Sequence, residues 1–384
     1  MRKIFILLLI CLFLFSIPVY ASNIPDINAN SAILMDIDSG RILYDKNINE
    51  KRPMASTTKI MTAIIALELG NLQDSVQVSE NSAKTEGSSI WLEAGEFLTL
   101  EELIYGLMLN SGNDAAVAIA EHIGGSVDGF AKLMNDKAKE IGAENTNFAN
   151  PHGLHDKNHY TTAHDLALIT RYALLNPIFK QIVKTSKKTI PWLDKEWDRQ
   201  LQNRNKLLWQ LEGADGVKTG YTSKAGRCLV ASATRQNQHL LSVILSSSSI
   251  FEESKKLLEY GFNNYTNNEI LNMYNSIGNI NVKDGSKDFA KVYPEKNIRV
   301  PLKSNEKNKV AIQIEAPDTI LAPFKKGQTI GRIKATIGNE ILGTCSLIIR
   351  EDINKKKNIY NFFSNIFIKL LKNVHITLPI PKYI

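Results

Sequence analysis

The amino-acid sequence predicts an α/β (α+β) sandwich, followed by a small all-β domain and a terminal amphipathic helix. Three observations lead to this order. Apolar, strand-like runs stand at both ends of residues 22–265, and helical patterns occupy the middle of that region. Apolar and polar residues alternate in several runs of residues 266–352, which is typical of strands with one buried face. Residues 353–384 then carry apolar side chains at helical spacing.

The first region opens with a predicted β-hairpin at residues 31–46, where two apolar runs flank the turn residues Asp-Ser-Gly. The helices that follow have recognisable ends: Gly70 stops the first, and a capping box from Thr99 to Glu102 opens the second. The predicted helices are residues 56–67, 99–109, 115–123 and 162–175. The region is therefore a helical block inserted between strands.

After the helical block the pattern becomes strand-like again. Residues 216–221, 228–233 and 239–245 are predicted to be adjacent antiparallel strands, with Lys218 at or near the end of the first. Residues 252–260 should form a helix that closes the domain. The mature chain keeps two cysteines, Cys228 and Cys345, which we expect to be buried thiols in different domains rather than a disulfide.

The N-terminus has the pattern of a targeting segment. Arg2 and Lys3 precede an apolar run over 4–17 and a small residue, Ala21, which together indicate a signal peptide over 1–21. An uncleaved anchor is the alternative, although the apolar run is shorter than a spanning helix needs. The protein is thus expected to be exported and peripheral, on the outer face of the cytoplasmic membrane.

The net charge of +7 is concentrated at the two ends of the chain. Arg2 and Lys3 supply two of the positive charges, and the tail after Asp352 supplies six lysines and no acid. A near-neutral body argues against a nucleic-acid partner. The basic tail, with a wide apolar helical face over 358–373, indicates contact with an anionic membrane surface. A helix packed on the β domain is the alternative.

Three short polar motifs carry the chemistry. They are Ser-Thr-Thr-Lys at 56–59, Ser-Gly-Asn at 111–113 and Lys-Thr-Gly at 218–220. Each is weak alone, since Ser-x-x-Lys also occurs at 304–307, but Lys-Thr-Gly occurs once. Their combination, with the first motif at a helix start, the second on a loop and the third on a strand, matches a known catalytic set.

This set would let a serine attack a carbonyl without a histidine. Ser56 is the candidate nucleophile, and Lys59, one helical turn later, is the candidate base. Burial and the like charge of Lys218 should lower the pKa of Lys59 from its usual value near 10.4. Ser111 could relay the proton to the leaving amine. The backbone N–H groups of Ser56 and Tyr221 are the candidate oxyanion donors.

The other motif residues suit substrate binding. Asn113 could bind a substrate amide or hold Lys59, while Lys218 and the hydroxyl of Thr219 suit a carboxylate. Gly220 leaves the strand edge bare, so that a peptide could pair with it as an added strand next to Tyr221.

On these motifs, and on residues 150–154 and 215–226, the chain resembles the low-molecular-weight penicillin-binding proteins of the serine D-alanyl-D-alanine carboxypeptidase family. The resemblance covers nearly the whole chain. It implies a fold of the penicillin-binding/β-lactamase type and removal of the terminal D-alanine from peptidoglycan stem pentapeptides. The reaction would pass through an acyl-enzyme on Ser56, need no cofactor and be blocked covalently by β-lactams.

One departure from that family concerns the substrate carboxylate. Several relatives carry an arginine after the strand that follows the third motif, whereas residues 246–249 here are four serines. The carboxylate anchor could then be Thr219 with Lys218, or Lys224 or Arg227. Rival functions are a β-lactamase, for which no Glu-x-x-Leu-Asn segment follows the second motif, a cross-linking transpeptidase, and a non-catalytic penicillin-binding sensor.

Four histidines at positions 152, 155, 159 and 164 could suggest a metal site. Their loop is rich in Gly, Asn and Asp, and no matched cysteine or acid completes a zinc pattern. Surface and loop packing explain these histidines better, so no metal is expected.

Overall fold

The computed structural model describes residues 24–192, 195–356, 366 and 368–369. They form two compact units, one ending at Tyr265 and the other starting at Thr266. The signal peptide predicted over 1–21 lies outside the described residues, as does most of the helix predicted over 358–373. Within the described part of the chain, no helix has the length and apolar character needed to cross a bilayer.

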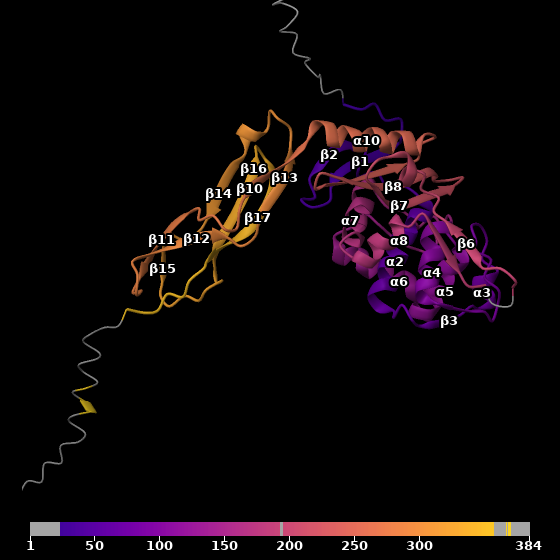
Figure 1. Cartoon of the computed structure of the whole chain (residues 1–384), viewed down its shortest axis with the longest axis horizontal. Helices are drawn as coiled ribbons and strands as arrows, with labels where there is room; N and C mark the ends of the chain where they lie inside the picture. The colour runs from indigo at the N-terminus through magenta and orange to yellow at the C-terminus, as the bar shows by residue number, and fades with distance from the viewer. Residues whose placement is uncertain (1–23, 193–194, 357–365, 367, 370–384) are drawn as a thin grey trace, which may run out of the picture. The chain divides into compact units, whose positions relative to one another are not determined.

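The first unit is built on a five-stranded antiparallel sheet with the order β2-β1-β9-β8-β7 (Figure 1). Its strands are β1 (Ser31–Asp36), β2 (Ile42–Lys46), β7 (Ala214–Thr222), β8 (Gly226–Arg235) and β9 (Gln238–Leu245). The two ends of the sequence region therefore meet in one sheet, because β1 pairs with β9. β7, which carries the third motif, is an edge strand.

Both faces of this sheet are buried. Along β8, Cys228 and Val230 belong to the apolar cluster on the side of the helical block, while Leu229 and Ala231 belong to the cluster formed with α10 (Ile250–Asn264). Successive side chains of a strand point to opposite faces, so this strand is apolar throughout rather than alternating.

The helical block covers the face opposite α10 (Figure 1). A 3₁₀ turn, η1 (Ala55–Thr58), leads into α2, and a π-helical segment, η2 (Gly106–Asn110), continues α4. The α-helices are α2 (Lys59–Leu69), α3 (Glu80–Ala83), α4 (Leu100–Tyr105), α5 (Asn113–Gly124), α6 (Val127–Ile141), α7 (Ala163–Ala173), α8 (Pro177–Lys184) and α9 (Leu207–Gln210). Two antiparallel two-stranded sheets complete the unit: β3 (Ser75–Gln77) with β4 (Phe97–Thr99), and β5 (Lys187–Ile190) with β6 (Arg199–Gln202).

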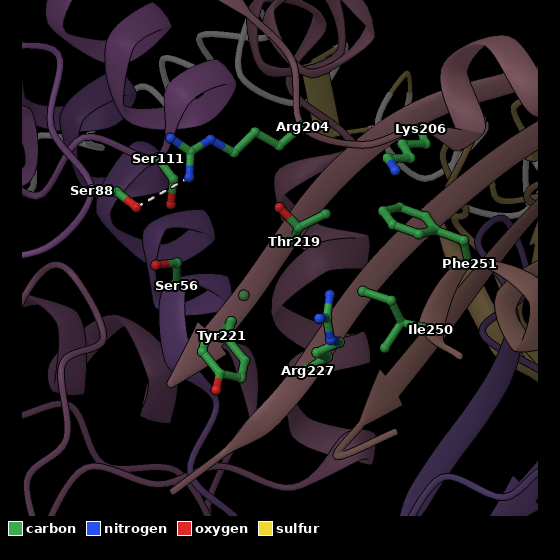
Figure 2. A pocket seen from close by; sticks show the side chains of 11 residues that line it. Ser56, Ser88, Ser111, Arg204, Lys206, Thr219, Tyr221, Arg227, Ile250 and Phe251 are labelled. Atoms are coloured by element: carbon green, nitrogen blue, oxygen red, sulfur yellow. Dashed lines mark hydrogen bonds between the residues drawn. The ribbon is translucent and has the colours of Figure 1, made fainter. Parts of the chain in front are cut away.

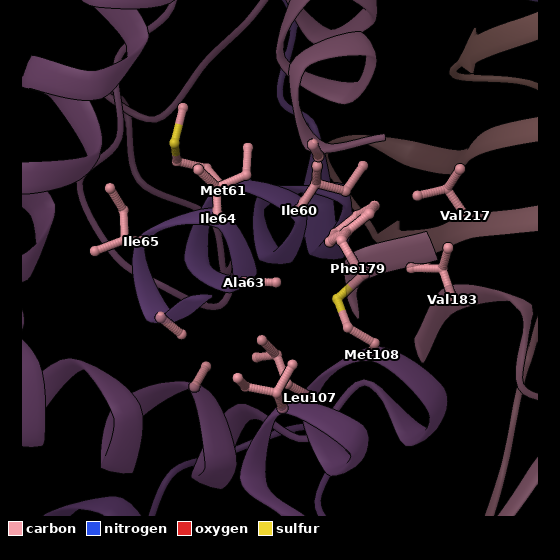
Figure 3. Packing of buried hydrophobic residues seen from close by; sticks show 14 of the residues in the cluster. Ile60, Met61, Ala63, Ile64, Ile65, Leu107, Met108, Phe179, Val183 and Val217 are labelled. Atoms are coloured by element: carbon pink, nitrogen blue, oxygen red, sulfur yellow. The ribbon is translucent and has the colours of Figure 1, made fainter. Parts of the chain in front are cut away.

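The apolar core fixes the helix and the strand that carry the two motif lysines. Figure 3 shows Ile60 of α2 near Phe179 of α8, and Val183 of α8 facing Val217 of β7. All four side chains are fully buried. Because interiors are packed as densely as organic crystals, α2 cannot shift relative to β7 without opening a cavity.

Residues 266–356 of the second unit form strands and loops with one short 3₁₀ turn, η3 (Lys307–Lys309). A six-stranded sheet has the order β14-β16-β17-β12-β11-β15, and β10 (Thr266–Leu271) pairs with β13 (Ile298–Leu302). The sheet strands are β11 (Gly278–Lys283), β12 (Phe289–Pro294), β14 (Ala311–Glu315), β15 (Thr319–Leu321), β16 (Thr329–Ile337) and β17 (Glu340–Ile349). This unit has its own apolar core.

The predicted fold class is confirmed, with an α/β unit followed by a β unit. The hairpin at 31–46, the capping box from Thr99 to Glu102 and the pair of buried thiols are also confirmed. The prediction that Lys218 lies at or near a strand end is wrong, because β7 extends well beyond it on both sides. The α-helix expected to reach Leu109 ends at Tyr105 and continues as η2.

Candidate active site

Ser56 and Lys59 lie together at the start of α2. Lys59 Nζ is 3.1 Å from Ser56 Oγ, and the lysine side chain is fully buried. Local bonds hold this turn, since the hydroxyls of Thr57 and Thr58 donate to the carbonyls of Met54 and Ala55 at 2.6 and 2.8 Å. The turn places the two functional side chains on one face, as the spacing of three residues requires.

Two further oxygen atoms surround the amine of Lys59. Its Nζ lies 2.7 Å from Asn113 Oδ1 and 2.7 Å from the backbone carbonyl oxygen of His152. Burial, and next the positive charge of Lys218, hold the pKa of Lys59 well below its ordinary value. The expected direction and causes of this shift are therefore confirmed. The side-chain amide of Asn113 thus bonds within the protein at both ends, because its Nδ2 donates to the Glu86 carbonyl at 2.6 Å.

The second motif sits where a helix is interrupted. Ser111 ends η2 in the left-handed conformation, with φ +66°, and Asn113 opens α5. Between them the chain turns, so that the Ser111 side chain lines the same cavity as Ser56. The sequence reasoning missed the residue that stabilises this turn. Asp114 is fully buried and accepts hydrogen bonds from Ser89 Oγ at 2.6 Å and from the backbone N–H of Leu92 at 3.1 Å.

The third motif runs along edge strand β7. Lys218 is almost fully buried beneath the strand and donates to the Thr219 carbonyl at 3.1 Å. Burial, and then the charge of Arg204, lower its pKa to about 7. Gly220 allows the strand to approach the start of α2, because a Cβ at this position would lie 3.0 Å from the backbone nitrogen of Ser56. The edge strand and the nucleophile are therefore in direct contact.

These motifs open on one cavity of about 310 Å³ (Figure 2). Its lining residues are Ser56, Ser88, Ser111, Arg204, Lys206, Thr219, Gly220, Tyr221, Arg227, Ile250 and Phe251. In the view of Figure 2, Ser56 and Ser111 lie on one side of Thr219, and Lys206, Ile250 and Phe251 lie on the other. The lining does not include Lys59, Asn113 and Lys218, which are buried.

Among the residues that the structure describes, the cavity lining has three cationic side chains and no acidic one. Arg227 and Lys224 are the two basic residues that the sequence suggested as carboxylate anchors. Arg227 lines the cavity and Lys224 does not. The other two cations of the lining, Arg204 and Lys206, were not predicted. Arg204 donates to Ser88 Oγ at 3.2 Å, which the dashed line in Figure 2 marks. The sequence does carry one signal for these two cations: residues 199–211 contain basic residues and no acidic residue.

Comparison with known proteins decides the family. Residues 19–249 match the family model described as D-alanyl-D-alanine carboxypeptidase, and residues 265–355 match the model of the penicillin-binding protein 5 C-terminal domain. The chain belongs to the D-alanyl-D-alanine carboxypeptidase family. The predicted resemblance is thereby confirmed.

Individual relatives of this carboxypeptidase family member cover most of its length. It is 37% identical to the D-alanyl-D-alanine carboxypeptidase DacF of Bacillus subtilis, over 85% of this chain and 86% of the relative. It is 33% identical to DacA of Escherichia coli, over 91% of this chain and 89% of the relative. The crystal structure of penicillin binding protein 5 from Haemophilus influenzae matches with a TM-score of 0.75 and 32% identity, over 86% of this chain and 99% of that one.

The histidines of the loop after α6 support the carboxypeptidase site from behind. His159 Nε2 lies 2.7 Å from Thr58 Oγ1, and its Nδ1 accepts the backbone N–H of Ala149 at 3.0 Å. Burial is the main cause that lowers the pKa of His152 to about 3 and that of His159 to about 4, so both rings are neutral near pH 7. Among the described residues, no group of three or more His, Cys, Asp or Glu could hold a metal.

Gly153 provides a test of this support. It has φ +90°, and a Cβ there would lie 2.0 Å from the carbonyl oxygen of Ala55. We predict that Gly153→Ala costs about 1–2 kcal/mol of stability for backbone strain and about 1–3 kcal/mol more for the clash. Acylation by penicillin should slow at least about tenfold, since displaced reacting groups lose rate steeply. Chemical denaturation and labelling kinetics measure the two effects.

Gly142→Ala is the matched control. Gly142 has nearly the same backbone angle, φ +88°, but no atom lies within 4 Å of a Cβ built there. It should lose only the strain energy and keep the labelling rate. Equal losses in the two variants would contradict the account of Gly153.

Proposed function

We propose that this protein is a serine-type D-alanyl-D-alanine carboxypeptidase that removes the terminal D-alanine of peptidoglycan stem pentapeptides through an acyl-enzyme on Ser56. The family and its named relatives support the reaction, and one observation supports the residue. A fully buried amine with a strongly lowered pKa stands 3.1 Å from the Ser56 hydroxyl oxygen.

The neutral amine of Lys59 is suited to act as the base. It has two N–H bonds and one lone pair. The carbonyl oxygens of Asn113 and His152, each 2.7 Å away, accept the two N–H bonds. The lone pair then faces the remaining neighbour, Ser56, whose O–H donates to it. The three contacts thus account for all three positions of an uncharged amine and orient the base toward its proton.

The remaining steps follow from the cavity. Ser56 Oγ attacks the carbonyl carbon of the penultimate D-alanine, and Lys59 takes its proton. The N–H groups of Ser56 and Tyr221 stabilise the oxyanion at the point where β7 touches the start of α2. Ser111 passes the proton to the departing amine. Water then hydrolyses the ester on Ser56, which releases the shortened peptide and restores the hydroxyl.

The terminal carboxylate binds at the cationic side of the cavity. Arg204, Lys206 and Arg227 contribute positive charge to the lining around Thr219, and the guanidinium of Arg204 lies on the Ser111 side of the cavity (Figure 2). In the described part of the chain, no carboxylate lines the cavity. A class A β-lactamase uses such a group to activate water for deacylation. A penicilloyl ester on Ser56 should therefore persist, which is the behaviour of a penicillin-binding protein.

We also propose that the protein is exported by its N-terminal segment and attached to the outer face of the cytoplasmic membrane by its tail. Six lysines and no acid follow Asp352, and the apolar face over 358–373 is broad. Electrostatic attraction to anionic lipids and insertion of an apolar helix face act together in such anchors.

The nucleophile is tested by Ser56→Ala. This variant should lose covalent labelling by a fluorescent penicillin and release of free D-alanine from a stem pentapeptide, because the ester of the proposed mechanism forms on the Ser56 hydroxyl. Gel fluorescence and mass spectrometry follow the two reactions. Ser223→Ala, in the exposed turn after β7, should retain both. Labelling of the Ser56→Ala protein would move the nucleophile elsewhere.

The role of Lys218 is tested by pH. Its pKa of about 7 means that it loses its charge as the pH rises above that value. The KM for a carboxylate-terminated pentapeptide should therefore rise above pH 7 in the native enzyme. Lys218→Arg should keep KM constant to higher pH because arginine stays protonated. A pentapeptide amide is the control and should show no such rise; the same rise with the amide would exclude carboxylate binding as its cause.

The membrane attachment is tested by truncation after Lys356. Ile353 and Lys355 form bridges with Phe324 and Gly285, so a cut after these residues leaves the β unit intact. The truncated protein should move from the membrane pellet to the soluble fraction and keep its carboxypeptidase activity. Retention in the pellet would mean that the tail is not the anchor.

A further inference from the structure

The second unit has a sheet face that points away from its apolar core. β11, β12 and β15 lie side by side in the six-stranded sheet (Figure 1). One face of β11 and β12 belongs to that core, through Ile280, Val282, Ala290 and Val292. Side chains alternate between the two faces of a strand, so the residues between these four point outward. We call the outward surface the aromatic face; it consists of Asn279, Asn281, Phe289, Lys291 and Tyr293 on the strands, and of Tyr274 just before β11.

Two aromatic rings of this face are largely exposed. Tyr274 is 71% exposed and Phe289 is 58% exposed. Exposed apolar groups that gather on one face mark interaction sites, whereas isolated ones do not. The guanidinium of Arg350 lies 5.5 Å from the ring centre of Tyr274 and 5.1 Å from that of Tyr293. These cation–π contacts hold both tyrosine rings in place. Part of the face is therefore ordered before any ligand arrives, which lowers the entropic cost of binding.

Polar side chains of the same surface lie beside the rings. Asn281 pairs with Phe289 on one neighbouring strand and with Thr319 on the other, and Asn279 pairs with Lys291. Residues directly opposite each other across two strands share a face. Among the residues that the structure describes, neither Asn279 nor Lys291 has a hydrogen bond or an ion pair through its side chain. An amide and a cation are therefore available to a ligand next to the aromatic rings.

The charge of this region is positive. No acidic residue occupies an outward position on the described strands β11, β12 and β15, where these positions are Asn279, Asn281, Lys283, Phe289, Lys291, Tyr293, Thr319 and Leu321. Residues 266–356 as a whole contain fifteen Lys or Arg and ten Asp or Glu. An anionic ligand is therefore attracted by the face and by the unit that carries it.

This set of groups suits a glycan that carries carboxylates. Aromatic rings pack against the apolar C–H faces of sugar rings, and amides pair with hydroxyl and acetamido groups. A lysine attracts the carboxylates. The centre of a protein–protein interface is depleted in lysine, and a helix or sheet that lies on a bilayer presents a continuous apolar surface. Here amides and a lysine alternate with the rings, which favours the glycan over both.

We propose that the aromatic face binds the glycan strands of peptidoglycan, whose attached stem peptides supply the carboxylates for Lys291. The choice of this polymer rests on the proposed function, in which the stem peptides are the substrate. The residues of the aromatic face belong to the second unit and do not line the active-site cavity, so the face binds the polymer and takes no part in cleavage. Binding the polymer raises the effective concentration of the stem peptides attached to it.

Co-sedimentation with purified, insoluble peptidoglycan tests the binding. The full-length Ser56→Ala protein is used, so that the polymer is not altered during the measurement. Adding Phe289→Ala or Tyr274→Ala should raise the Kd for the polymer about tenfold, the effect of removing one aromatic anchor. Adding Lys291→Gln should weaken binding and make it less sensitive to salt, because one screened charge contact is lost.

Ile341→Ala is the matched control. Ile341 is 60% exposed on the same unit, but it lies near the start of β17, whereas Arg350 follows the end of that strand. The control should leave binding unchanged, and thermal unfolding checks that each variant is folded. Unchanged binding in the Phe289 and Tyr274 variants would overturn the inference. If the two variants instead lose binding to vesicles of anionic lipid, or lose self-association, the face belongs to a membrane contact or to a second copy of the chain and the inference is wrong.

Activity separates this inference from the proposed function. In protein that retains Ser56, Phe289→Ala should lower the release of D-alanine from insoluble, pentapeptide-rich peptidoglycan about tenfold when the polymer is below saturation. Release from a soluble pentapeptide should stay unchanged, and equal losses on both substrates would contradict a polymer-binding role. If the native protein releases D-alanine from neither substrate, the proposed function fails, while sedimentation still decides whether the aromatic face binds the glycan.

Discussion

The catalytic unit depends on keeping one lysine amine buried, uncharged and oriented. Lys59 has no exposed surface, and its Nζ touches three oxygen atoms from η1, α5 and the loop after α6. A buried ammonium without a carboxylate partner is costly, so the neutral form is favoured and the pKa falls. Burial thus keeps the amine in the neutral form that can accept a proton from Ser56. A serine hydroxyl is a poor nucleophile without such a base.

The surrounding structure can be understood as support for that amine. Asp114 fixes the turn that presents Asn113, and His159 binds Thr58 beside the nucleophile. The charge of Arg204 has two effects at once. It lowers the pKa of Lys59 and Lys218, and it makes the cavity attractive to a substrate carboxylate. In the proposed mechanism, substrate binding and the basicity of Lys59 are thus coupled through the guanidinium of Arg204.

The cationic residues also connect two regions of the surface. Arg204 and Lys206 line both the active-site cavity and a neighbouring cavity that includes Trp209. Among the described residues, those that line the two cavities belong to the first unit. The second unit has its own apolar core.

Local sequence determined the elements whose signals are local. The capping box at Thr99, the hairpin at 31–46 and the alternating strands of the second unit depend on neighbouring residues, and the three motifs could be recognised by spacing. Only the tertiary structure decided which residues meet. Arg204 and Lys206 enter the cavity, and the His152 carbonyl reaches Lys59, because segments far apart in the chain pack on one another. A sequence pattern reports periodicity within a segment, whereas burial, charge proximity and pKa arise between segments.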